Sequence, residues 1–262
     1  IAGDAVAARI YYVIGCAVSA VYLWSVRGVL TPSLLPPRLR WSALKDILRV
    51  GVASSAISLS TNVTAVVATG LAGLVGPAAV AGYGTGVRLE YLLVPLVFGL
   101  GAPVAAMVGT AMGAGRPERA IQVAWTGAAI AGGLTEAIGL LAASFPHAWL
   151  AMFGADATML AYGTLYLRVV GPAYGFFGAG LLLYFALQGA GRLGWPMLAA
   201  AVRVVISAGG GWFAVTMLSS SIGLFGALAA ALVVFGGVNA GAVALGGTFG
   251  IARRPRLAVQ PS

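Results

Sequence analysis

The chain has 262 residues, of which 60% are hydrophobic and only 8% are charged. In soluble proteins about a quarter of the residues are charged, so this composition excludes a soluble domain. A net charge of +9 in a soluble protein would indicate a nucleic-acid partner. Here, however, the basic residues lie in short segments between long apolar runs, where they orient membrane helices. We therefore expect a protein that contacts membrane lipid and binds no nucleic acid.

The apolar runs predict seven membrane-spanning helices. A helix needs about 20 apolar residues to cross the bilayer, and these runs are too long and too uniformly apolar for barrel strands. Apolar length and the positions of Gly, Pro and charged residues place the helices at about 5–26, 50–74, 86–112, 120–144, 158–188, 196–217 and 222–248. The predicted fold class is an all-α, polytopic membrane protein.

The basic residues also predict how the helices are oriented. Segment 27–49 carries five Lys and Arg residues, whereas the connections expected near 76–82, 146–156 and 219–221 carry none. Because Lys and Arg favour the cytoplasmic side, we expect segment 27–49 and the tail 251–262 to be cytoplasmic. The predicted location is the inner membrane of the cell.

The start of the chain indicates a longer protein. By the same charge rule the first predicted helix begins on the outer side of the membrane. The chain opens on Ile1 in place of a methionine. We therefore expect further helices to precede this segment.

Charged side chains inside the predicted spans are the first candidates for a functional site, because a charge in lipid is costly and usually faces a cavity or a partner. These residues are Arg88, Glu90, Glu136, Arg168 and Arg203. Glu136 and Arg168 lie at similar depth, so we expect them to pair, or Arg168 to pair with Glu90. Such a pair either holds helices together or contains a carboxylate that responds to a proton or cation, and Glu90 is the leading candidate for that carboxylate.

Aromatic side chains crowd the fifth predicted helix. Tyr174, Phe177 and Tyr184 follow Pro172 there, and Gln188 lies near the end of the helix. Core packing is the ordinary role of such residues, but aromatic faces in a membrane cavity also attract organic cations. We include them among the candidate substrate-binding residues. The sequence contains no metal-ligand cluster, nucleophile constellation or cofactor fingerprint, so we expect neither an enzyme nor a cofactor.

Two parts of the chain resemble the multidrug and toxic compound extrusion (MATE) transporters. Residues 86–101 (GVRLEYLLVPLVFGLG) and 108–120 (VGTAMGAGRPERA) resemble that family's eighth helix and the loop after it. Residues 166–172 and 187–192 resemble its tenth helix and the exit of that helix. The resemblance extends from the sixth to the twelfth family helix and so covers essentially the whole chain.

The resemblance implies a secondary antiporter built from two six-helix lobes around a central cavity. Inward flow of H⁺ or Na⁺ would drive outward movement of amphipathic, often cationic, drug-like compounds by alternating access. This chain would supply the last helix of the N-terminal lobe (1–26), a cytoplasmic linker (27–49), the C-terminal lobe (50–250) and a tail (251–262). The rest of the N-terminal lobe is then the expected missing partner.

Two positions depart from the family pattern. Some members carry a cation-binding glutamate in the seventh helix, where this chain has Asn62, and an aspartate in the tenth helix, where it has Phe177. We therefore expect the coupling carboxylate to be Glu90 or a residue of the missing lobe. Asn62 is expected to line the cavity as a neutral hydrogen-bonding group.

Other functions remain as alternatives. A flippase of lipid-linked oligosaccharides or polysaccharides, from the same superfamily, would be favoured by a basic cavity formed by Arg88, Arg168 and Arg203. Residues 80–84 faintly resemble a potassium-channel filter, and a structural membrane protein is the last candidate.

Overall fold

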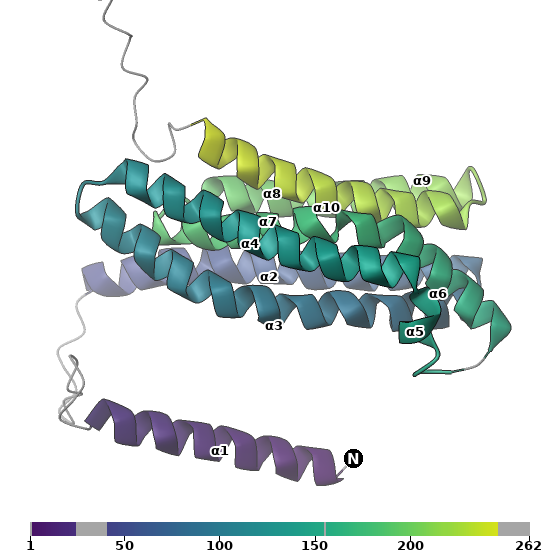
Figure 1. Cartoon of the computed structure of the whole chain (residues 1–262), viewed down its shortest axis with the longest axis horizontal. Coiled ribbons are helices and arrows are strands. Elements are labelled where there is room, and N and C mark those ends of the chain that lie inside the picture. Colours follow the sequence, from purple (N-terminus) through teal and green to yellow (C-terminus); the bar gives the residue numbers. More distant parts are fainter. Residues whose placement is uncertain (1, 25–40, 155, 246–262) are drawn as a thin grey trace, which may run out of the picture. The chain divides into compact units, whose positions relative to one another are not determined.

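The computed structural model describes residues 2–24, 41–154 and 156–245, and nearly all of them are helical (Figure 1). The chain divides into two units, residues 1–47 and 48–262. The first unit contains α1 (Ala2–Trp24). Most of the predicted linker 27–49 and the whole predicted tail 251–262 lie outside the described residues, although α2 begins at Trp41.

The remaining elements follow in chain order. They are α2 (Trp41–Val75), α3 (Pro77–Gly113), α4 (Pro117–Ser144), α5 (Pro146–Leu150), α6 (Ala157–Val170), the 3₁₀-helix η1 (Gly171–Ala173), α7 (Tyr174–Gly189), α8 (Gly194–Val205), the π-helix η2 (Ile206–Gly210), α9 (Gly211–Thr216) and α10 (Ser221–Ala244).

Six helical segments of the described chain are long and apolar enough to cross a membrane. They are 54–75, 77–113, 117–144, 157–189, 194–216 and 221–244. The predicted all-α, polytopic fold is therefore confirmed. The first predicted helix also forms, as α1, but its apolar stretch Arg9–Tyr22 is shorter than these six.

One predicted connection is wrong. We expected residues 76–82 to form an outer turn, but only Gly76 separates α2 from α3. Gly76 has φ +147°, a conformation that favours glycine, and Pro77 then occupies a first-turn position that suits proline. Residues 80–84 are consequently helical, so they cannot present the row of carbonyl oxygens that an ion filter requires.

The helix α7 lies at the centre of the second unit and packs against α3, α4 and α10 (Figure 1). In the α6–α7 span 72% of the most apolar window is buried, compared with 28–39% in the other spans. The span is interrupted by η1, where Pro172 lacks a backbone N–H and disfavours a continuous helix.

Close backbone contact holds the central span against α4. A Cβ atom built on Gly139 of α4 would collide with the carbonyl oxygen of Gly171, whereas one on Gly133 of the same helix would meet nothing within 4 Å. Small residues at such points let membrane helices pack tightly through van der Waals contact.

We expect Gly139→Ala to destabilise the protein by about 1–3 kcal/mol, because the backbone at Gly171 must move to admit the methyl group. Thermal unfolding of the detergent-solubilised protein measures this loss. Gly133→Ala is the matched control and should leave stability unchanged or slightly raised, because alanine favours helix over glycine. Equal unfolding temperatures for the two variants would contradict the described helix contact.

Candidate functional site

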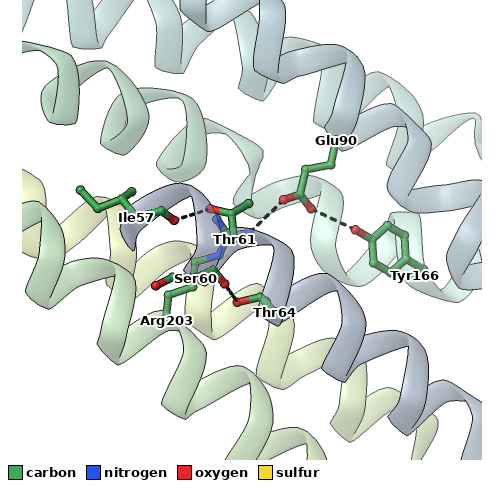
Figure 2. A network of polar contacts seen from close by, with 7 residues as sticks. All are labelled: Ile57, Ser60, Thr61, Thr64, Glu90, Tyr166 and Arg203. Atoms are coloured by element: carbon green, nitrogen blue, oxygen red, sulfur yellow. Dashed lines mark hydrogen bonds and ion pairs between the residues drawn. The ribbon is translucent and has the colours of Figure 1, made fainter. Parts of the chain in front are cut away.

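A buried ion pair joins α3, α6 and α8. Glu90 Oε1 accepts a hydrogen bond from Arg203 Nη2 at 3.0 Å, and Glu90 Oε2 accepts one from the Tyr166 hydroxyl at 3.3 Å (Figure 2). Glu90 is 9% exposed and Arg203 is 6% exposed. Both carboxylate oxygens are thus engaged, and removing either partner would leave a costly buried charge.

Arg203 also has partners that carry no charge. Its guanidinium carbon lies 5.4 Å from the centre of the Phe177 ring on α7 and 5.7 Å from that of Phe235 on α10. Cation–π attraction at these distances is strengthened where water is excluded. The rings therefore help to hold the guanidinium in place independently of Glu90.

A cavity of about 30 Å³ opens beside the ion pair. Its polar lining consists of Thr61, Thr64, Tyr83, Glu90, Tyr91, Tyr166, Arg203 and Ser207, and the rest of the lining is apolar. A water molecule needs roughly 10–15 Å³ measured in this way, so the cavity has room for about two. The cavity is small and lies among mid-chain residues of several spans, so it is a candidate site for a small group.

The α2 side of the cavity is lined by hydroxyl groups. Thr61 donates to the Ile57 carbonyl oxygen at 3.3 Å, and Thr64 donates to the Ser60 carbonyl oxygen at 3.0 Å (Figure 2). These bonds satisfy the donors of both hydroxyls. Their oxygen lone pairs remain to accept hydrogen bonds from molecules in the cavity.

Two buried donors, on α8 and η2, lack a partner among the described residues. Arg203 Nε and Ser207 Oγ make no hydrogen bond within the described part of the chain. Ser207 belongs to η2, and π-helical turns occur frequently at functional sites. This cavity therefore combines a buried ion pair with unsatisfied donors.

Comparisons with known proteins show the family of the chain. Residues 52–213, more than half of the chain, match the MatE family model. The chain belongs to the MatE family. Members of this family are transporters and not enzymes, so the predicted family and the multi-pass membrane location are confirmed.

Two similar proteins match this chain over part of their own length. The probable multidrug resistance protein NorM of Thermotoga maritima is 25% identical over 169 residues, which make up 64% of this chain and 36% of that protein. A MOP superfamily transporter from Pyrococcus furiosus shares the fold with a TM-score of 0.68 and 18% identity, over 76% of this chain and 44% of that one. The chain therefore spans less than half the length of either relative.

The ion pairs predicted for this MatE chain are wrong. Glu136 accepts a hydrogen bond from the Gly175 backbone N–H at 2.7 Å, and Glu90 pairs with Arg203. Arg168 is exposed and pairs with neither carboxylate among the described residues. Arg168 and Glu136 do not meet, because the side chain of Arg168 leaves α6 on its exposed face.

Several of the predicted site residues do not line the cavity of the MatE chain. Asn62 is exposed and donates to the Ser58 carbonyl oxygen at 2.9 Å. Arg88 is exposed and lies over the Phe153 ring at 5.0 Å, and Gln188 donates to Ser54 Oγ at 2.9 Å.

Two of the predicted aromatic residues lie in the core of the MatE chain. Tyr184 is buried against Phe185, with ring centres 5.1 Å apart. Tyr174 is fully buried. Of the predicted set, Glu90, Arg203 and Phe177 meet at the site.

Sequence reasoning missed Tyr166, Phe235 and Ser207. Tyr166 lies within a segment that carries the family resemblance, which was the available signal for it. Phe235 and Ser207 lie in uniformly apolar or small-residue stretches and gave no signal.

Asp156 marks the start of the central span on a loop outside the membrane-spanning segment. Its Oδ1 accepts hydrogen bonds from the Thr158 hydroxyl at 2.6 Å and the Met159 backbone N–H at 2.7 Å. The bond from Thr158 has the largest effect, and together these bonds lower the pKa of Asp156 below its ordinary value.

We expect Asp156→Ala to lower the unfolding temperature of the MatE protein at pH 7 and to have less effect in acid. A lowered pKa in the folded state gives stability that is present above the ordinary carboxyl pKa and is lost as the pH falls through the lowered one. Unfolding temperatures of both proteins across the acid range measure this. A difference that does not shrink with falling pH would contradict the capping role of the carboxylate.

Proposed function

We propose that this chain is the C-terminal lobe of an antiporter that exports amphipathic compounds bearing a cationic group in exchange for inward H⁺ or Na⁺. MatE membership and the likeness to NorM support transport. The observation that carries the proposal is Glu90, a carboxylate buried in the membrane part of the chain beside a cavity. Intramembrane carboxylates commonly mark ion and proton pathways.

The ion pair supplies the alternative states that such a mechanism needs. Each Glu90 oxygen accepts one hydrogen bond, so a cation or proton that binds there competes with Arg203 and Tyr166 for the carboxylate. A ligand shifts a conformational equilibrium only through different affinities for its two states. Occupation of Glu90 by Arg203 in one state, and by the transported or coupling ion in the other, gives that difference.

The proposal includes a first lobe in a longer protein. The chain covers 36% of NorM and 44% of the Pyrococcus furiosus transporter, which fits one lobe and little more. In this arrangement residues 1–26 are the last helix of the N-terminal lobe, 27–49 link the lobes, and 50–250 form the second lobe. The tail 251–262 then lies in the cytoplasm, and the protein lies in the inner membrane.

The charge of the cavity argues against an oligosaccharide flippase. A pyrophosphate head group would favour a basic cavity, yet the charged residues that line it are Glu90 and Arg203, one of each sign. Arg88 and Arg168 are exposed and do not line it.

Transport of a fluorescent lipophilic cation by the full-length protein in proteoliposomes tests the proposed function. We expect movement of the cation against its own gradient that stops when the H⁺ and Na⁺ gradients are collapsed. Vesicles without protein are the control for passive leakage. Equal downhill movement in both directions, independent of any ion gradient, would indicate a pore and overturn the proposal.

A further inference from the structure

Two buried polar atoms of opposite kind lie on the packed helices α8 and α10 without a hydrogen-bond partner among the described residues. One is Nε of Arg203 on α8, a nitrogen that can only donate, and the other is Oδ1 of Asn239 on α10, an oxygen that can only accept. Arg203 is 6% exposed and Asn239 is 0% exposed. Because an unpaired polar group is costly inside a membrane span, the protein gains from a conformation that brings such a donor and acceptor together.

The amide of Asn239 has a defined orientation. Its Nδ2 donates to the Phe235 carbonyl oxygen at 3.1 Å, and a carbonyl can accept only from the amide nitrogen, so the unpaired atom is the oxygen. Residues four apart lie on the same face of a helix, and the Phe235 ring centre is 5.7 Å from the guanidinium carbon of Arg203. The unpaired oxygen therefore belongs to the residue one helical turn beyond the ring that Arg203 contacts.

The direction of the helices places Asn239 on the side toward which Arg203 leans. A Cβ atom built on Gly210, which follows Arg203 in the chain, would lie 3.1 Å from the Cβ atom of Ala227, which precedes Phe235. The two helices are therefore antiparallel, and positions before Arg203 lie level with positions after Phe235. Helical side chains lean toward the N-terminus of their own helix, which for Arg203 is the direction of Asn239.

The exchange of partners at Glu90 creates a need for this oxygen. When a proton or cation occupies the carboxylate, Arg203 loses its countercharge while it is still buried, which is strongly unfavourable. The rings of Phe177 and Phe235 provide cation–π attraction but no oxygen atom. An amide oxygen accepts a charge-assisted hydrogen bond from the guanidinium and, being neutral, does not compete with Glu90 for the coupling ion.

We propose that Asn239 is a positioning residue for the exchange at Glu90, and that its Oδ1 accepts a hydrogen bond from the Arg203 guanidinium when the ion pair opens. This rests on the proposed function, in which a proton or cation displaces Arg203 from Glu90, and it adds the group to which Arg203 moves. Arg203 alternates between a charged partner on α3 and a neutral partner on α10.

Unfolding of the full-length protein in mixed micelles tests the second partner. Glu90→Met removes both acceptor oxygens from the ion pair and so frees Arg203, whereas Asn239→Leu removes the amide at similar volume. We expect Asn239→Leu to raise the unfolding equilibrium constant at least about tenfold more in the Glu90→Met background than in wild type, since a hydrogen bond to a charged group is then lost. The same effect in both backgrounds would overturn the proposal.

Asn62→Leu is the matched control. Asn62 also donates its Nδ2 to the carbonyl oxygen four residues earlier, that of Ser58, but it is exposed, so its replacement should have the same effect in both backgrounds. Ser207→Ala tests the buried hydroxyl one turn after Arg203, on the side away from which Arg203 leans. A background dependence for Ser207→Ala in place of Asn239→Leu would assign the second partner to Ser207 and overturn the proposal.

Transport of the fluorescent cation provides a readout that needs no change at Glu90. Asn239→Leu should lower the gradient-driven rate at least about tenfold, because Arg203 has no partner when it leaves Glu90. Asn239→Gln keeps an amide oxygen and should recover part of the rate. An Asn239→Leu protein that transports at the wild-type rate would contradict the positioning role.

The two proposals fail in different ways. Gradient-driven transport in wild type, without background dependence of Asn239→Leu in the unfolding measurements, overturns this inference and leaves the proposed function standing. Gradient-independent movement in wild type overturns the proposed function and this inference with it.

Discussion

Replacing Arg203 by Met is expected to lower the free energy of unfolding by about 3–5 kcal/mol, because it leaves the buried carboxylate of Glu90 without its countercharge. Methionine retains apolar contact with Phe177 and Phe235, so the loss is electrostatic and not one of packing volume. Equilibrium unfolding of the full-length protein in mixed micelles measures it.

A double-mutant cycle separates the interaction energy of Glu90 with Arg203 from the contributions that each residue makes elsewhere. Glu90→Gln combined with Arg203→Met removes both charges and should recover most of the stability lost in Arg203→Met alone. Arg168→Met, at an exposed position, should change stability by no more than about 0.5 kcal/mol. A double variant as unstable as the sum of the two single variants would show that the residues do not interact.

Replacing Glu136 by Ala is expected to cost about 1.5–3 kcal/mol, the range for a hydrogen bond to a charged group. Glu136 accepts the Gly175 N–H at 2.7 Å in the first turn of α7, next to the break at η1. Without an acceptor, that N–H lies unpaired within a membrane span, where water does not replace it. The carboxylate also faces the positive end of the α7 dipole.

Glu136→Gln is the matched control, because glutamine keeps an acceptor oxygen at the same distance from the backbone. We expect it to lose only the part of the stabilisation that depends on charge. Unfolding in mixed micelles, with the Gly133→Ala protein as a neutral α4 variant, gives the comparison. If Glu136→Ala is as stable as wild type, the carboxylate does not hold the α6–α7 break.

The membrane spans were predictable because bilayer thickness fixes their length. Which face of each helix points into the protein was not predictable. In a soluble helix the apolar stripe shows which side is buried, but lipid-facing and interior faces of a membrane helix are both apolar. Arg168 and Glu136 were therefore expected to face each other, which they do not, and the partner of Arg203 could not be chosen from sequence.

The same limit explains why Asn62 was expected to line the cavity but is exposed. Adjacent helical residues point about 100° apart, since there are 3.6 residues per turn. Family alignment selected Asn62, whereas its neighbours Thr61 and Thr64 line the cavity. The expected turn at 76–82 failed for a different reason: glycine and proline were taken to mark a loop, but Pro77 begins a helix.

We propose that Glu90 is the coupling carboxylate of this lobe. It is tested most directly by measuring how transport of the fluorescent cation depends on the H⁺ and Na⁺ gradients in wild type, Glu90→Gln and Glu136→Gln proteoliposomes containing equal amounts of folded protein. We expect wild type and Glu136→Gln to respond to the ion gradient and Glu90→Gln not to respond. A Glu90→Gln protein with the gradient dependence of wild type would contradict it.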